Sequence, residues 1–446
     1  MVSHKVAVSC AYFSAFFGLG LCLAVVGPSL LQLAANTGSG VDAIGSIFTW
    51  RAVGYLIGSV SGGQLFERLP GNPLLAIATL CCSIGTLFIP YCASLAALGL
   101  CTAVQGAAMG FLDTGGNVLL IRLWASEDDP STADPYMQTM HFFFAVGAFV
   151  IPIIMDAYDQ VGFAFAASFI TISAYLLLVF LALVAVSWAE AAEKKAAHGG
   201  VGSVGTEKDA GKRKGPSART VQEKWLFFSA GLLLFIYVGA ESTYGGLVYT
   251  YSVTALGWTS SNGKAVTSIY WGGLAVGRLV AVPLSMKFSP VQLLFGDLLG
   301  CFVSALALLV FPRSDAVWWV MSGVYGLAMA SIFPAVINSA AFYTTVDGPA
   351  TSAMVVGASI GDMTIPLGTA LFFVSPGPFT FPIIVFALTC GCVVALFGLF
   401  FAGRAIAKMK RNTTPPKWPG RGGEQKDIIE VTSSAISIVE LKKNEN

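Results

Sequence analysis

The chain has 446 residues, of which 55% are hydrophobic and 11% are charged, whereas an ordinary soluble domain is about 25% charged. Its mean hydropathy is +0.74, and 25 basic residues stand against 24 acidic ones. A soluble enzyme of this size would need far more polar surface, and a nucleic-acid binder would need a basic excess. Both classes are therefore excluded.

Twelve apolar runs are each long enough to cross a bilayer, which takes about 20 helical residues. The runs are continuous rather than alternating, so they predict helices and not the strands of a barrel. The predicted spans lie near 6–34, 43–66, 73–92, 94–123, 136–157, 160–188, 224–252, 264–286, 290–312, 316–343, 350–374 and 379–403.

One long polar gap, residues 189–222, is rich in Gly, Ala and Lys and has little to bury. Such a composition is typical of a flexible linker. The gap divides the chain into an N-terminal six-helix bundle (1–188) and a C-terminal six-helix bundle (223–404). A polar tail (405–446) follows the second bundle.

The lysines and arginines predict the orientation in the membrane. They gather at the N-terminus, in the linker and in the tail, whereas the opposite side has only Lys264 and Arg313 in its loops. The positive-inside rule then places both termini in the cytoplasm, and we expect the plasma membrane. The sequon at Asn412-Thr413-Thr414 should therefore stay unglycosylated.

A weak internal repeat relates the two halves. The matched pairs are Gly106 with Gly326, Gly147 with Gly361, and Phe13 with Phe228, at offsets of 220, 214 and 215. Three similar offsets across one linker indicate two related halves. Two parallel repeats of six spans are typical of the major facilitator architecture. We therefore predict an all-α membrane protein with twelve transmembrane helices in two pseudo-symmetric six-helix bundles.

Two acids inside predicted spans are the strongest functional signals, because a charge in the hydrocarbon region costs about 2.5–3.5 kcal/mol even on the mildest scale. Asp113 lies in the fourth span with Asn117 one turn further on, and Glu241 lies in the seventh span on a face shared with Tyr237 and Tyr244. We expect Asp113 and Glu241 to couple a cation, and Asn117, Glu241 and the two tyrosines to bind solute. The alternative is a pair of buried acids satisfied by neighbouring helices.

Other polar groups within the spans have more than one interpretation. Arg278 is predicted to form a structural ion pair with Asp297 or Asp362, which would lock helices together. Further candidates for solute binding are Gln105, Gln138, His141, Trp271 and Asn338. Each of these also has an ordinary structural interpretation as a packed or hydrogen-bonded side chain. The nine cysteines show no CxxC or Cys/His spacing, so we expect no metal site and no cofactor.

Several motifs resemble those of one family. Gly63 to Arg68 resembles the Gly-x-x-x-Asp-Arg signature of the major facilitator superfamily. Leu112-Asp113-Thr114-Gly115-Gly116-Asn117 looks like the Leu-Glu-Thr-x-x-Asn stretch of the fucose/galactose/glucose symporter family, as do segments around Trp271, Arg278 and Asp362. Tyr237-Val238-Gly239-Ala240-Glu241 is similar to its sodium-dependent glucose-transporter-like group. The resemblance implies that Asp113 is a coupling residue, and the aspartate that bacterial fucose symporters have in the first span is absent here.

We therefore expect a secondary active transporter and not an enzyme. Its substrate would be a small polar solute, most simply a hexose sugar, moved by alternating access with sodium or a proton. The alternatives are a carrier of another metabolite or organic anion, and a non-transporting receptor on the same fold. We expect a monomer whose partners are the solute and the lipid bilayer, with no nucleic acid.

Overall fold

The computed structural model describes residues 2–124, 134–198, 219–285, 287–344 and 348–409. Every regular element in these ranges is a helix, and twelve segments are long and apolar enough to cross a bilayer. The predicted all-α fold with twelve transmembrane helices is confirmed. The sequon at Asn412 and most of the predicted linker and tail lie outside the described residues.

The N-terminal bundle contains spans one to six. Its elements are α1 (Val2–Ala24), α2 (Val26–Thr37), α3 (Val41–Ile44), α4 (Ser46–Leu65), α5 (Gly71–Phe88), the 3-10 helix η1 (Ile89–Tyr91), α6 (Leu95–Trp124), α7 (Asp134–Gln160) and α8 (Ala166–His198).

The C-terminal bundle contains spans seven to twelve. Its elements are α9 (Val221–Thr254), α10 (Ser260–Ser285), α11 (Pro290–Val310), α12 (Asp315–Met329), α13 (Ile332–Tyr343), α14 (Gly348–Val374) and α15 (Thr380–Met409).

Helix α8 continues to His198, past the predicted end of the sixth span at 188. The extension is rich in Ala, Glu and Lys, which are strong helix formers. Glu190 within it accepts a hydrogen bond from the side-chain amide of Asn72 at 2.7 Å, which ties the extension to α5. The segment predicted as a flexible linker therefore begins inside a helix.

Two spans are interrupted just before a proline. The first span breaks at Val25, three residues before Pro28, and the tenth breaks at Ala330 and Ser331, before Pro334. A proline has no backbone N–H, and its ring clashes with the carbonyl four residues earlier. Each interruption places that carbonyl outside the helix that contains the proline.

Glycines at matched positions bring helix backbones into contact in both halves. A Cβ added at Gly106 would lie 2.0 Å from the carbonyl oxygen of Arg51, and one at Gly326 would lie 2.0 Å from that of Tyr270. The contact between α4 and α6 is thus repeated between α10 and α12. The predicted correspondence of the fourth and tenth spans, and with it the pseudo-symmetry of the bundles, is confirmed.

The same relation holds between α1 with α7 and α9 with α14. A Cβ at Gly147 would meet the carbonyl oxygen of Phe17 at 2.1 Å, and one at Gly361 would meet that of Phe235 at 1.8 Å. Phe17 therefore corresponds to Phe235, at an offset of 218. The offset of 215 predicted for the first and seventh spans was wrong by about one helical turn, because short apolar matches recur with the helical period.

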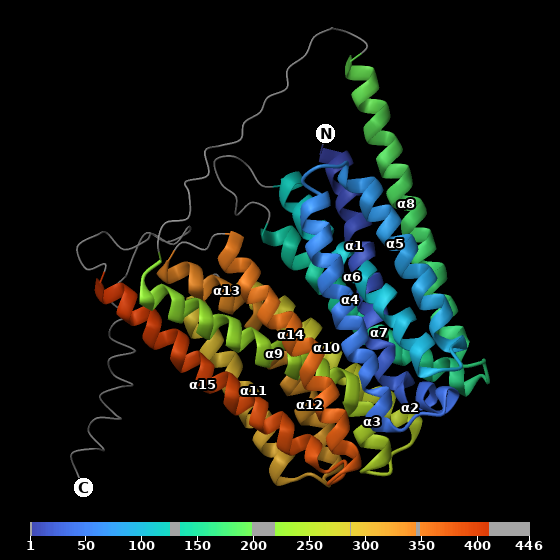
Figure 1. Cartoon of the computed structure of the whole chain (residues 1–446), viewed down its shortest axis with the longest axis vertical. Coiled ribbons are helices and arrows are strands. Elements are labelled where there is room, and N and C mark those ends of the chain that lie inside the picture. Colours follow the sequence, from blue (N-terminus) through green and yellow to red (C-terminus); the bar gives the residue numbers. More distant parts are fainter. Residues whose placement is uncertain (1, 125–133, 199–218, 286, 345–347, 410–446) are drawn as a thin grey trace.

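The two bundles meet chiefly along four pairs of helices, α7 with α10, α4 with α14, α2 with α9, and α3 with α14, with a smaller contact between α2 and α10. Figure 1 shows the bundles close together beside α2 and α3, and leaning apart toward the end where α1 begins and α13 lies. The end that carries the N-terminus is therefore the more open one.

Candidate functional site

A hydrogen-bonded chain of side chains is built around Asp113 in α6. Tyr55 of α4 donates its hydroxyl to Asp113 Oδ2 at 2.5 Å, and the Asn117 amide donates to Oδ1 at 3.1 Å. Asn117 Oδ1 lies 3.2 Å from Nε2 of His141 on α7. All four side chains keep some exposed surface. They are therefore not completely enclosed by neighbouring side chains.

Arg278 of α10 reaches this chain from the other bundle. Its Nη1 donates to the backbone carbonyl of His141 at 2.7 Å, and its guanidinium carbon lies 5.4 Å from the centroid of the Phe144 ring. The guanidinium charge interacts with Asp113 and also with Glu241 of α9. One cation in the C-terminal bundle thus faces one carboxylate from each half.

The acids around this interface outnumber the bases. Asp362 of α14 interacts electrostatically with Arg51 of α4 and with Glu241, so three carboxylates share the region with two guanidinium groups. With all five groups ionised, the region lacks one positive charge. A bound proton or a monovalent cation would supply it, because an uncompensated charge away from water is costly.

This missing positive charge does not imply a metal centre with several protein ligands. Among the described residues, no three His, Cys, Asp or Glu side chains are grouped as metal ligands. A cation near Asp113 would instead be held by that single carboxylate together with neutral oxygens, such as the Tyr55 hydroxyl. Hard monovalent and divalent cations accept such oxygen ligands.

The structure forms neither of the ion pairs predicted for Arg278. Asp297 accepts a hydrogen bond from the Ser331 hydroxyl at 2.5 Å, and the cation beside Asp362 is Arg51. The sequence gives the depth of each residue in the membrane, but packing decides which way each helix turns its side chains. Arg278 therefore faces Asp113 and Glu241 and not the acids at a similar depth.

A pocket begins beside Arg278 and extends toward the end of the molecule that carries the N-terminus. Its free volume is about 60 Å³, well below the roughly 300–1,000 Å³ usual for small-molecule sites, so the pocket is narrow in this state. Its polar lining comes from Gln138 of α7 and from Arg278, Ser331 and Asn338 of the C-terminal bundle. Two of the predicted solute-binding residues, Gln138 and Asn338, are thus brought together across the two halves.

Four other predicted solute-binding residues are sealed from this pocket. Tyr244 bonds to Ser322 at 2.7 Å within an aromatic cluster, and Tyr237 donates to the backbone carbonyl of Met329 at 3.0 Å. Gln105 is fully buried against Thr86 of α5. The fourth is Trp271, which is 2% exposed, and a Cβ on Gly245 would lie 2.4 Å from its ring.

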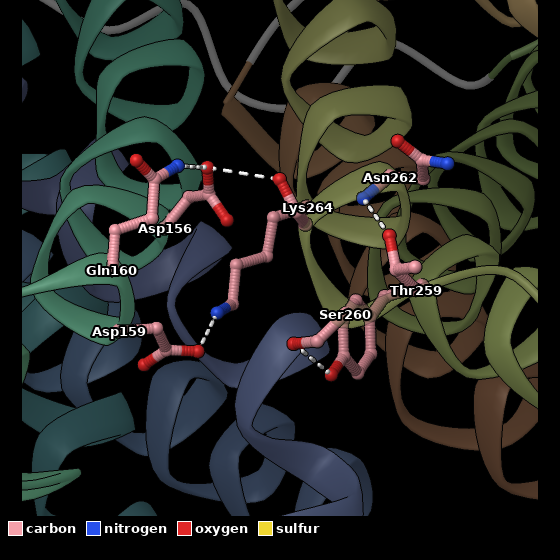
Figure 2. A network of polar contacts seen from close by, with 9 residues as sticks. Asp156, Asp159, Gln160, Thr259, Ser260, Asn262 and Lys264 are labelled. Carbon is pink, nitrogen blue, oxygen red and sulfur yellow. Dashed lines mark hydrogen bonds and ion pairs between the residues drawn. The ribbon is translucent and has the colours of Figure 1, made fainter. Parts of the chain in front are cut away.

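The opposite end of the interface between α7 and α10 is closed by polar contacts (Figure 2). Lys264, only 3% exposed, pairs with Asp159, and the Ser261 hydroxyl donates to Asp156 at 3.0 Å. Gln160 donates to the same Asp156 oxygen at 2.7 Å. We call these five residues the α7–α10 latch. Among pairs of described residues, Lys264 with Asp159 is the one ion pair shorter than 4.0 Å.

Sequence reasoning did not find the α7–α10 latch. From the sequence, Lys264 was interpreted only as a basic loop residue on the side opposite the termini. A usable signal existed, because Lys264 lies at the start of a predicted span and Asp156 and Asp159 at the end of another. Opposite charges at the ends of two spans on the same side of the membrane are candidates for a pair.

The sequence matches a known protein family and several of its members. The Major Facilitator Superfamily model matches residues 8–344. Sodium-dependent glucose transporter 1 of Xenopus laevis is 34% identical over 371 residues, which cover 78% of this chain and 72% of that protein. The human protein of the same name is 29% identical over 385 residues, covering 79% and 71%.

A further relative is the Danio rerio major facilitator superfamily domain-containing protein 4A, which is 27% identical over 461 residues, covering 87% of this chain and 86% of that protein. The family model covers well over half of the chain, and the Xenopus relative is more than 30% identical over most of its own length. The chain therefore belongs to the Major Facilitator Superfamily, in the group that includes the sodium-dependent glucose transporter 1 proteins.

Proposed function

We propose that this protein is a secondary active transporter that moves a hexose by alternating access, coupled to sodium or a proton. The observation that carries the proposal is the excess of one carboxylate at the interface of the two bundles, where the Arg278 charge interacts with both Asp113 and Glu241. The relatives named as sodium-dependent glucose transporters support the sugar and the cation. The proposed setting is the plasma membrane with cytoplasmic termini.

The proposed coupling follows from the cost of charge in a dry site. While the carboxylates at the interface outnumber the guanidinium groups, bringing the two halves together removes water from an unbalanced charge and is unfavourable. Binding a proton or sodium ion at Asp113 balances the charge and lowers that cost. Solute held by Gln138, Asn338 and neighbouring groups can then be enclosed, so that the ion gradient drives its movement.

In this structure the α7–α10 latch closes one end, and the pocket lies toward the other. With the proposed orientation, this is an inward-facing state in which the pocket opens to the cytoplasm. The opposite state would require the latch to separate.

A carrier of organic anions is the second candidate, since Arg278 lies in the pocket wall. A free guanidinium there would favour a carboxylate or phosphate. However, Asp113 and Glu241 already oppose this charge, so the site as a whole repels anions. A non-transporting receptor would have no need of two such costly acids in the membrane interior.

The test uses Asp113→Asn in proteoliposomes with labelled hexoses and imposed sodium or proton gradients. The substitution keeps the shape and most hydrogen bonding of Asp113 but fixes a neutral state. We expect accumulation against a gradient to be lost while exchange of labelled sugar across the membrane persists. Asp42→Asn, a neutralised acid in the short helix α3, is the matched control and should accumulate sugar as the unmodified protein does.

Glu241→Gln tests the other carboxylate. We expect it to weaken sugar binding, seen as a higher KM in exchange, because this acid interacts electrostatically with Arg278, which lines the pocket. Uptake against a gradient at the unmodified rate in Asp113→Asn would show that this acid is structural. Failure of every hexose in exchange, with the protein folded, would instead overturn the sugar assignment.

A further inference from the structure

Two cysteine side chains approach each other where the third span meets the fourth. Cys92 directly follows η1, and Cys101 lies in the second turn of α6. Their sulfur atoms are 3.6 Å apart. Cys92 is buried and Cys101 is partly exposed, so the pair lies at the edge of the bundle. A sulfur–sulfur bond is about 2.05 Å long, so the two sulfur atoms lie about 1.5 Å beyond bonding distance.

The position of this pair in the membrane is set by the chain path. Helix α5 starts at Gly71 on the side of the termini and crosses to η1, where the amide of Asn36 at the end of α2 donates to Pro90 at 3.4 Å. The pair therefore lies at the end of the molecule away from the termini. In the proposed orientation this is the extracellular face, and it is formed in the lumen of the secretory pathway, where disulfides are made and persist.

We propose that Cys92 and Cys101 form a disulfide in the mature protein, which closes the connection between the third and fourth spans. The oxidant is the disulfide of a secretory thiol oxidoreductase. Both cysteine S–H bonds are lost and one S–S bond forms, while the two electrons and two protons convert the oxidoreductase disulfide to two thiols. This inference rests on the proposed orientation, but not on the substrate or the coupled ion.

The chain offers an internal control of nearly the same geometry. The sulfurs of Cys22 and Cys82 are 3.8 Å apart, but both side chains are fully buried between α1 and α5. Close approach of two thiols therefore does not by itself identify a disulfide. An oxidoreductase can reach the edge of the bundle at Cys92 and Cys101 but not its interior, so we expect Cys22 and Cys82 to remain thiols.

The test counts reducible cysteines in the full chain expressed in animal cells. Membranes are denatured in N-ethylmaleimide, which blocks all free thiols, then reduced, and the released thiols are labelled with a 5-kDa polyethylene-glycol maleimide. We expect a shift equal to two labels. Cys92→Ser or Cys101→Ser alone should remove both labels, whereas Cys22→Ser or Cys82→Ser should leave two.

Two outcomes would overturn the inference in distinguishable ways. In the first, no label is added, and a protease supplied outside intact cells leaves the 199–218 segment uncut. The orientation then stands, and the disulfide is absent. The second is that no label is added and the protease cuts this segment from outside, so that the orientation itself is wrong. Sugar exchange in proteoliposomes is independent of both and would still test the proposed function.

Discussion

At the residue scale, the central finding is that Arg278 connects the two halves. A single hydrogen bond to the His141 carbonyl and electrostatic contact with Asp113 and Glu241 make it respond to both carboxylates. If either acid takes a proton or a cation, its attraction for the Arg278 charge is lost while that of the other acid remains. The arginine is therefore placed to report the state of one half to the other, because its energy depends on groups in both.

Arg278→Gln removes this shared charge while keeping some hydrogen-bonding capacity. We expect gradient-driven uptake to fall at least tenfold, because a hydrogen bond to a charged group contributes about 1.5–3 kcal/mol. Arg278→Lys keeps the charge but not the planar geometry, so its uptake should lie between that of the unmodified protein and that of Arg278→Gln. Labelled-sugar uptake normalised to surface expression measures the effect.

The contrary result for Arg278 is equally clear. Loss of surface expression in Arg278→Gln, together with full recovery of both expression and uptake in Arg278→Lys, would mean that the arginine acts only as a structural charge. Arg313→Gln, at an exposed loop position, controls for the removal of any one cation.

The candidate site could be predicted from sequence only in part, and the reason is visible on α9. Charge in an apolar run revealed Asp113, Glu241 and Arg278, because burial of charge is rare and costly. The partners were not predictable, since they depend on helix rotation. Tyr244 lies three residues after Glu241 on nearly the same face, yet it packs inside the C-terminal bundle while Glu241 borders the interface.

At the element scale, hydropathy was sufficient for the number and approximate limits of the spans. The predicted 94–123 and 290–312 differ from α6 and α11 by at most two residues at each end. The breaks at Val25 and at Ala330 were not predicted, because a proline in the sequence does not by itself tell whether a span is interrupted. Pro152, Pro283 and Pro366 lie within unbroken helices. Whether neighbouring helices satisfy the freed backbone groups decides each case, and that is a property of the packed bundle.

The matched glycine contacts give a prediction at this scale. Gly106→Ala and Gly326→Ala each place a Cβ 2.0 Å from a backbone carbonyl oxygen, so the helices must separate. Overpacking of this kind costs about 1–3 kcal/mol, and we expect a lower thermal midpoint. Fluorescence-detected size-exclusion chromatography after heating measures it in detergent.

Gly296→Ala in α11 is the matched control, because nothing lies within 4 Å of its added Cβ. Replacing an unhindered helical glycine by alanine favours the helix slightly, so its midpoint should stay the same or rise. Equal midpoints for Gly106→Ala and Gly296→Ala would show that the helices do not approach as closely as described.

At the scale of the whole molecule, the interface between α7 and α10 joins two functions along one line of contacts. The α7–α10 latch lies at one end, Gly272 packs on Phe149 in the middle, and Arg278 contacts His141 toward the pocket. A rigid rocking of one bundle against the other would change all three places together. The charge state near Arg278 can therefore influence closure at the latch without any separate signalling path.

The latch predicts how this equilibrium can be shifted. Lys264→Gln leaves Asp159 unpaired, and because the Asp159 side chain is 55% exposed the loss should be only about 1–2 kcal/mol. That corresponds to a roughly five- to thirty-fold shift toward the state open at the latch. Ser29→Cys, at a fully buried position of α2 in the closed state, reports this opening through its rate of labelling by a membrane-impermeant thiol reagent.

We expect Lys264→Gln and Asp159→Asn to accelerate labelling of this cysteine, and the exchanged pair Lys264→Asp with Asp159→Lys to restore the slow rate. Arg313→Gln should leave the rate unchanged. If the exchanged pair labels as fast as the single variants, the ion pair does not hold the two bundles together, and closure at this end rests on apolar packing alone.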